Sequence, residues 1–569
     1  MIRQIMFSRM TAQTARFSFV KCGSRNKRKM IVTQCIRSIS SETSSDGHFF
    51  ITTPIFYVNA EPHIGHLYSA LLADAACRFQ QLHGLPVNSL LFSTGTDEHG
   101  LKIEQAAVAN GSDPLQFCNK VSHKFRYLFD LANISYTQYV RTVEERHKCA
   151  VKHFFSKLMD RGHIYLGDYS GWYCVSDETF LTEAQVHEIT LPSSEKRLVS
   201  AESGHPVEWN TENNYMFKLS QFQSDLQYWL KDDKRVQPKR FHQQLQRWVN
   251  EDLQDLSVSR PSYRVSWGIP VPGDTLHTIY VWVDALINYL TAAGYPNTEL
   301  WPPDVQVLGK DILRFHGVYW PALLIGIGLE PPRSLLCHSH WTVEGEKMSK
   351  SLGNVVCPQD CIKRYSADGL RYLLLRGGTP HSDSNWSEAH AVHILNVELA
   401  DALGNLLSRC TAPSLNPNQL MPPLDQQYLK KMPLAGQKLV EQLVELPCII
   451  EKHYHDFNFY HGIEVAMAAV RQANAFVQEE KPWELKNLPD SNHLDSVLRV
   501  ALETVRMVGI ALQPVVPTLA SQLLDSLGVP VHHRAWVNLK DGFSNAQYDN
   551  LSSSFNLGPR KKLFTKIKL

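Results

Sequence analysis

The sequence predicts an α/β protein with a Rossmann-like parallel sheet that is split by an insertion and followed by an all-α helical bundle. Three changes of pattern along the chain indicate this. From about residue 48 to 134, short β-prone apolar runs alternate with runs of helical periodicity. Between 163 and 265 the pattern changes to short strands and turns. From about 387 to 527 it is almost entirely helical.

Length and composition are those of a globular protein with several domains. The chain has 569 residues, of which 43% are hydrophobic and 20% charged. It contains no apolar run of about 18 residues, so no membrane association is expected. The 11 cysteines include no CxxC pair, and therefore give no signal for a zinc knuckle or a redox site.

Residues 1–41 have the composition of a mitochondrial presequence. The segment contains nine basic residues and no acidic one, and it lacks the longer apolar stretch of a secretory signal. The alternative is a basic arm that binds RNA. Without this segment the net charge of +1 falls to about −8, so a nucleic-acid partner would need a local basic surface. One such surface is the tail with Arg560, Lys561, Lys562, Lys566 and Lys568.

The first expected ligand site lies where a strand meets a helix. A β-prone run at 49–57 ends in a turn, and a helix-like run follows from about residue 67. His63 and His66 lie at this junction, at the sheet edge where ligands bind and where helix N–H groups suit a phosphate. Gly65 between them would let a flat ring lie against the backbone. The simpler alternative is a helix start with two solvated histidines.

Polar residues also follow the next strand, 89–95, at the same expected edge. Asp97 there suits a substrate ammonium group; its simpler role is to cap a helix, and it can do both. We expect the sheet to resume with strands near 278–283 and 305–309, each of which leads into a helix. A basic loop then follows at 347–351.

The histidine run 63–66 and the basic loop 347–351, in this order and so far apart, resemble the paired signature of class I aminoacyl-tRNA synthetases. Four further runs narrow the resemblance to methionyl-tRNA synthetases, over about residues 48–540. These runs are 52–66, 94–100, 280–285 and 309–312.

The resemblance implies that the protein activates an amino acid with ATP, bound together with Mg²⁺, and releases pyrophosphate. Negative charge then develops on the phosphates, so donors and cations must converge on the triphosphate from more than one side. No covalent nucleophile is needed. The expected catalytic residues are His63, His66, Lys347 and Lys350, and the expected ATP site comprises these four with Gly65 and Ser349.

The same resemblance implies a methionine pocket. Asp97 would hold the ammonium group, and aromatic and apolar side chains would enclose the thioether, because sulfur–aromatic contacts are favourable by roughly 0.3–1.5 kcal/mol. For any single aromatic residue an ordinary core position is the simpler interpretation. The expected pocket consists of Ile55, Tyr57, Asp97, Trp282, Ala285, Leu286, Tyr289, Ile312 and His316.

In the helical part, Asn405 and Arg409 lie one helical turn apart, and Trp483 follows a proline. The resemblance implies that these three side chains bind the anticodon, by base-edge contacts and stacking. It further implies mitochondrial tRNA(Met), methionine and ATP as partners, a location in the mitochondrial matrix and, without an additional C-terminal domain, a monomer. Only Cys174 lies in the knuckle region of the insertion, so no structural zinc is expected.

These expectations divide the chain into seven parts. They are the presequence (1–41), the first half of the Rossmann catalytic domain (42–162), the connective insertion without a zinc knuckle (163–265), the second half of the catalytic domain (266–335), the lysine loop with a stem-contact region (336–390), the α-helical anticodon-binding domain (391–540) and a C-terminal tail (541–569).

The expected function is therefore that of a methionine–tRNA ligase. Three alternatives remain open at this point: a smaller adenylyltransferase with the same histidine motif, a class I synthetase for another amino acid, and a non-catalytic tRNA- or RNA-binding paralogue. A cysteinyl enzyme would need zinc ligands at the substrate, which the sequence does not supply. A non-catalytic paralogue would be indicated by degraded signature residues, whereas all four are present.

Overall fold

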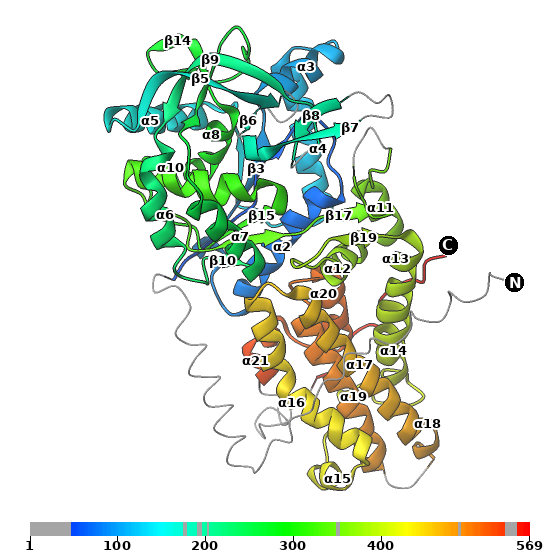
Figure 1. Cartoon of the computed structure of the whole chain (residues 1–569). Coiled ribbons are helices and arrows are strands. Elements are labelled where there is room, and N and C mark those ends of the chain that lie inside the picture. The colour runs from blue at the N-terminus through cyan, green and yellow to red at the C-terminus, as the bar shows by residue number, and fades with distance from the viewer. Residues whose placement is uncertain are drawn as a thin grey trace, which may run out of the picture. The chain divides into compact units, whose positions relative to one another are not determined.

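The computed structural model describes residues 47–174, 179–181, 183–190, 196–201, 204–348, 353–487, 491–540 and 555–568. The expected presequence lies outside these residues. His48–Leu569 forms one compact unit, in which a parallel sheet comes first along the chain and a helical bundle second (Figure 1). The predicted fold class is confirmed.

A parallel sheet organises the first part. Its strands lie in the order β10 (Val236–Gln237), β16 (Leu335–His338), β15 (Val305–Gly309), β1 (Phe49–Thr52), β3 (Leu90–Asp97) and β2 (Phe56–Tyr57), and β4 (Gln138–Arg141) also pairs with β3.

The strand expected at 49–57 is interrupted. Pro54, which has no N–H to donate to a ladder, lies between β1 and β2. Helix α2 (Ile64–Leu82) then packs on β1, β3 and β15. Its apolar face is buried, with Leu67 and Leu71 fully inaccessible. The remaining helices of this part are α3 (Leu101–Ala109), α4 (Pro114–Leu131), α5 (Glu145–Asp160), α8 (Val281–Leu286), α9 (Asn288–Ala292) and α10 (Trp320–Ile327).

The insertion is built on antiparallel strands. Its main sheet has the order β11 (Leu256–Ser257), β9 (Glu208–Phe217), β5 (Ile164–Cys174) and β6 (Thr179–Leu181), and β7 (Val186–Thr190) pairs with β8 (Lys196–Ser200). The same stretch of chain also contains β10, α6 (Gln223–Trp229) and α7 (Lys239–Asn250). Because β10 pairs in parallel with β16, part of the range 163–265 belongs to the main sheet.

The prediction that residues 278–283 form a strand of the main sheet is wrong. The strand found there, β14 (Asp274–Ile279), lies in a separate antiparallel sheet between β12 (Ser259–Pro261) and β13 (Pro270–Val271). Its first four residues are partly or fully exposed, as in a strand with one solvated face. The main sheet resumes only at β15.

A small three-stranded sheet carries the start of the basic loop. In it β17 (Trp341–Val343) pairs with β18 (Glu346–Lys347) and β19 (Ser384–Trp386). Helices α11 (Pro358–Tyr365) and α12 (Ala367–Gly377) follow the loop. Lys347 thus ends a β-strand, which sets the position of its backbone.

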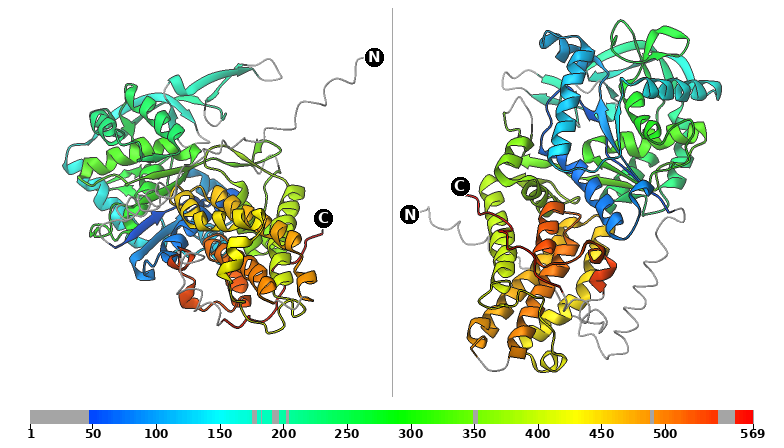
Figure 2. Two further views of the ribbon diagram at one scale, coloured as in Figure 1. Left: turned by 90° about the horizontal axis from the view of Figure 1, so that it is seen from below. Right: turned by 180° about the vertical axis from the view of Figure 1, so that it is seen from behind.

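The second part is a bundle in which α16 (Leu434–His455), α17 (Phe459–Glu480) and α19 (Ser491–Ala511) run side by side (Figure 2). It begins with α13 (Glu388–Ile394), a π-helical segment (Leu395–Gly404) and α14 (Asn405–Cys410), which follow one another directly. The shorter helices are α15 (Gln426–Lys431), α18 (Pro482–Leu485), α20 (Pro517–Ser526) and α21 (Val537–Lys540).

A buried arginine joins the bundle to the sheet domain. Arg371 of α12 donates to the Asp74 carboxylate in α2 at 2.6 Å, to the Val515 carbonyl at 2.9 Å and to the Ala132 carbonyl at 3.1 Å. Burial alone would raise the pKa of Asp74, but Arg371 and Arg78 lower it below its usual value. This network fixes α2 against the junction of α19 and α20.

The described part of the C-terminal tail, 555–568, lies along the π-helical segment. The Ile567 N–H donates to Asn396 Oδ1 at 2.9 Å, and Lys566 Nζ lies 2.7 Å from the Asp401 carboxylate. Leu563 and Phe564 pack against the hydrophobic core. Within the described part of the chain, no helix has both the length and the apolar character needed to cross a membrane.

Candidate active site

The two histidines of the first motif cap α2. His63 precedes the helix, and its Nδ1 accepts the Gly65 N–H at 3.0 Å. His66 Nδ1 accepts the His63 N–H at 3.2 Å, and the two rings stack with centroids 3.8 Å apart. A Cβ at Gly65 would lie 2.9 Å from a carbon of the His63 ring, so glycine allows the ring to cover the helix start.

Both rings are uncharged at neutral pH. Burial, together with Lys347 and His340, lowers the pKa of His63 to about 4. Burial and the neighbouring His63 hold the pKa of His66 well below its usual value. Because each Nδ1 accepts a backbone N–H, the single ring proton lies on Nε2. The pair therefore offers N–H donors rather than positive charge.

The expected substrate residues line one cavity of about 330 Å³ at the carboxyl ends of β1, β3 and β15. The cavity is bordered by His63, Gly65, His66 and Lys347 of the expected ATP site. All expected methionine residues line it as well: Ile55, Tyr57, Asp97, Trp282, Ala285, Leu286, Tyr289, Ile312 and His316.

Two polar groups of the pocket bind each other. His316 Nδ1 donates to the Ile312 carbonyl at 2.9 Å, and burial lowers the pKa of His316 to about 4. The neutral ring can therefore accept the Tyr289 O–H at Nε2, over 2.7 Å. Trp282 stacks on Phe315 with centroids 3.8 Å apart. These contacts hold the aromatic rings at fixed angles around the apolar part of the cavity.

Three polar residues that sequence reasoning missed line the same cavity as the histidine motif. Asp311 accepts from His340 Nε2 at 3.1 Å and lies 3.7 Å from Lys347 Nζ. Burial would raise the pKa of Asp311, but His340 and Lys347 hold it well below its usual value. His338, at the end of β16, also lines the cavity. In the sequence, these polar residues could have been recognised by their position at or just after the end of a buried strand.

A buried network holds α8 in place. The Asp284 carboxylate accepts from His99 Nδ1 at 2.6 Å and from His147 Nε2 at 2.7 Å. Burial would raise the pKa of Asp284, but the two histidines lower it to about 2. This connects α8, which carries Trp282 and Ala285, to the end of β3 and to α5. The signal in the sequence was an acidic residue within an apolar helical run.

Of the basic loop, Lys347 and Met348 belong to the described residues. The Lys347 side chain is 68% exposed, and Met348 is buried with its terminal methyl carbon 3.7 Å from the position of a Cβ at Gly65. The loop thus begins beside the start of α2. The expected residues Ser349 and Lys350 lie outside the described residues.

The expected anticodon residues lie on two helices that both contact α19. Asn405 begins α14 and is exposed, Arg409 is half-buried on the same helix, and Trp483 is half-buried on α18. Asn405 Nδ2 donates to Asp401 at 3.3 Å. In the part of the chain that the structure describes, no hydrogen bond or ring contact joins the three side chains to one another.

A family model described as "tRNA synthetases class I (M)" matches residues 49–411. The parallel sheet, the histidines at the start of α2 and the lysine at the border of the same cavity agree with this class of enzyme. A second model, "Anticodon binding domain of methionyl tRNA ligase", matches residues 431–568. The chain belongs to the methionyl-tRNA synthetase family.

Curated relatives and a solved structure agree with this. The mitochondrial methionine–tRNA ligase of Homo sapiens is 50% identical over 512 residues, which cover 87% of this chain and 86% of the relative. The probable mitochondrial methionine–tRNA ligase of Dictyostelium discoideum is 44% identical, covering 88% and 89%. Mycobacterium tuberculosis methionyl-tRNA synthetase in complex with methionyl-adenylate has a TM-score of 0.83 at 33% identity, covering 91% of this chain and 99% of that chain.

Proposed function

We propose that this chain is a methionine–tRNA ligase, which converts methionine and ATP to methionyl-adenylate and pyrophosphate and then transfers methionine to the 3′ end of mitochondrial tRNA(Met). The observation that carries the proposal is the single cavity, because it is lined both by the histidine and lysine motifs and by the whole expected methionine pocket.

In the activation step, the methionine carboxylate attacks the α-phosphate of ATP and pyrophosphate leaves. His63 and His66 would donate from Nε2 to the phosphate oxygens, beside the N–H groups at the start of α2. Lys347, and with it Ser349 and Lys350 of the same loop, would bind the triphosphate as well, as positive charges and a hydroxyl donor. Mg²⁺ would enter with the ATP phosphates, since this ion prefers oxygen ligands and retains water.

For methionine, Asp97 would bind the ammonium group at the end of β3. The rings of Tyr57, Trp282 and Tyr289 would surround the thioether, a polarisable group that packs well on aromatic rings. Tyr289 and His316 satisfy each other's polar atoms, so an apolar side chain can bind beside them without leaving a buried donor unpaired. This favours methionine over polar side chains.

For tRNA, we propose that Asn405, Arg409 and Trp483 bind the anticodon, with 391–540 as the anticodon-binding domain and 336–390 as the region that contacts the acceptor stem. The anticodon-domain model spans residues 431–568, so it extends past the proposed boundary at 540 into the basic tail. A mature chain with a net charge of about −8 makes such local contacts necessary.

The curated relatives are mitochondrial enzymes, which supports a mitochondrial location. We propose the matrix as the compartment, residues 1–41 as the targeting segment and a monomeric enzyme. Fusion of residues 1–41 to a fluorescent protein tests the targeting segment, with a fusion in which the nine basic residues are replaced by glutamine as the matched control.

The test of the activity is ATP–pyrophosphate exchange with each amino acid separately. Exchange with methionine alone is expected. Exchange with a different amino acid would overturn the pocket assignment, and no exchange with any amino acid, with or without tRNA, would favour a non-catalytic RNA-binding protein. A Lys350→Met variant tests whether Lys350, which lies outside the described residues, is needed for this exchange. Lys363→Met, on the exposed surface of α11, is the control.

A further inference from the structure

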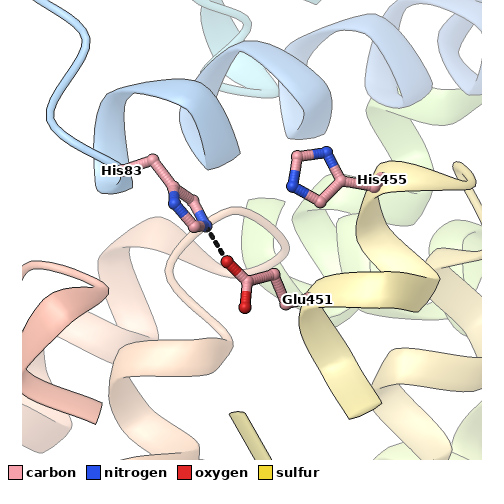
Figure 3. Close-up of side chains that lie close together, drawn as sticks. All are labelled: His83, Glu451 and His455. Atoms are coloured by element: carbon pink, nitrogen blue, oxygen red, sulfur yellow. Dashed lines mark ion pairs between the residues drawn. The ribbon is translucent and has the colours of Figure 1, made fainter. Parts of the chain in front are cut away.

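Three side chains with metal-binding atoms converge where α2 meets α16. They are His83, directly after the last residue of α2, and Glu451 and His455 of α16 (Figure 3). One ligand atom from each lies within 4.8 Å of the other two. Glu451 and His455 are four residues apart, and therefore share one face of their helix. All three side chains point toward the same space in Figure 3.

The surroundings of this cluster are buried on one side and open on the other. The Glu451 side chain is 2% exposed, and its Oε1 lies 3.7 Å from Nε2 of His83, whose side chain is 26% exposed. The Phe79 ring contacts the rings of His83 and His455, with centroids at 4.6 and 5.1 Å, and His83 stacks on Trp536 at 5.1 Å. An apolar wall strengthens the binding of a cation to a buried carboxylate, and the open side provides an entry path.

We propose that His83, Glu451 and His455 form a site for a divalent transition-metal ion, for which Zn²⁺ is the best-suited ion. Two imidazoles and one carboxylate are a ligand set typical of Zn²⁺, with water in the fourth position. Imidazole nitrogen also suits Co²⁺ and Ni²⁺, whereas Mg²⁺ and Ca²⁺ prefer an all-oxygen set.

The required movement is small. Zinc–ligand bonds of roughly 2.0–2.2 Å place tetrahedral ligand atoms about 3.4 Å apart, and the three ligand atoms lie within 4.8 Å of one another, so no separation in the cluster must shorten by more than about 1.4 Å. In the metal-bound state this shortening would come from rotation of the imidazole and carboxylate groups. The backbone itself is held in place by two backbone hydrogen bonds. The backbone N–H of Trp536 donates to the Leu82 carbonyl at 2.8 Å, and the backbone N–H of His83 donates to the Phe79 carbonyl at 3.1 Å.

A metal here would connect two parts of the enzyme. Helix α2 starts directly after His63 and ends at this cluster, about 28 Å away along the helix axis. Helix α16 belongs to the bundle that would bind the anticodon. The site therefore stabilises the contact between these parts and takes no part in the chemistry. It is unrelated to the insertion around Cys174, for which no structural zinc was expected.

Metal binding by the full chain, stripped with a chelator and titrated with Zn²⁺ against a chromophoric competitor, tests this proposal. Wild type is expected to bind one equivalent tightly, and His83→Gln and His455→Gln are each expected to lose at least about tenfold in affinity. The matched control is His390→Gln, which removes an exposed histidine of α13. Equal affinity in all four proteins, or no stoichiometric binding to wild type, would overturn the proposal and leave the His83–Glu451 contact as an ion pair only.

Two further readouts separate ligand loss from misfolding. Co²⁺ is expected to give the visible absorption band of a four-coordinate ion in wild type and in His390→Gln, but not in His455→Gln. Zn²⁺ is expected to raise the Tm of wild type and control only, while the metal-free Tm and methionine-dependent pyrophosphate exchange of His455→Gln stay as in wild type. A Zn²⁺-induced rise of Tm that is equal in all the variants would contradict the assignment.

Discussion

Replacing Asp284 with asparagine tests how the methionine side of the cavity is positioned. The Asp284 carboxylate is buried and accepts hydrogen bonds from His99 at 2.6 Å and from His147 at 2.7 Å. Its pKa of about 2 keeps it charged at neutral pH. A hydrogen bond to a charged group contributes roughly 1.5–3 kcal/mol, and asparagine has one accepting oxygen with which to keep one of the two. We therefore expect Asp284→Asn to lower the free energy of unfolding by about 2–3 kcal/mol.

The loss should affect methionine more than ATP, because Asp284 lies in α8 between Trp282 and Ala285. About half of this free energy, about 1.4 kcal/mol, is expected to appear as weaker methionine binding, which corresponds to a rise of about tenfold in the KM for methionine. The KM for ATP should stay within about twofold. Pyrophosphate exchange with each substrate varied in turn measures both, and a fall in Tm of several degrees is expected beside them.

The control for this experiment is Asp304→Asn. Asp304 accepts the Phe50 N–H at 2.8 Å and pairs with Arg333 just before β15, at the end of that strand away from the cavity. It should lower Tm without a selective change in the KM for methionine. A lowered Tm with an unchanged KM for methionine in Asp284→Asn would show that the network stabilises the fold without positioning the pocket.

Three further predictions concern catalysis, tRNA and pH. Lys347→Met should lower the kcat of pyrophosphate exchange at least about 100-fold with folding intact, because a group that stabilises the developing phosphate charge is lost; an unchanged kcat would remove Lys347 from the mechanism. Trp483→Ala should lower kcat/KM for tRNA(Met) roughly 5- to 150-fold, the equivalent of about 1–3 kcal/mol of stacking, and leave pyrophosphate exchange intact; equal charging by both proteins would refute the anticodon role. The pKa of His63 is lowered from 6.5 to about 4, so its contribution to stability is fully present above pH 6.5 and is lost as the pH falls toward 4. The pH profile of kcat/KM for ATP should accordingly show no ionisation of this residue near 6.5, and an inflection there that disappears in His63→Gln would contradict its neutral state.

The sequence predicted those elements of the fold whose periodicity is local. The β-prone run 49–57, which the structure divides into β1 and β2, the helix after His63 and the bundle helices each contain enough residues for their pattern to be recognised. β10 has only two residues, and its pairing with β16 depends on contacts about a hundred positions away in the chain. β14 was assigned to the wrong sheet because its apolar end, which leads into α8, hides the exposed residues at its start.

The residues of the cavity could be predicted because they lie in runs that resemble one family. The resemblance does not predict which contacts hold these cavity residues in position. The pairing of Asp311 with His340 and the contacts of Asp284 with two histidines join elements that are far apart in sequence, and only the tertiary structure brings them together. An ionisable residue such as Asp284 inside an apolar helical run is nevertheless a signal, since a buried charge must be paired.

A bisubstrate inhibitor shows whether one cavity binds methionine and ATP side by side. A non-hydrolysable sulfamoyl analogue of methionyl-adenylate carries both groups in one molecule. We expect it to compete with methionine and also with ATP in pyrophosphate exchange, and to bind at least about 100-fold more tightly than either substrate. Competition with only one of the two substrates, or binding no tighter than methionine alone, would contradict the single shared cavity.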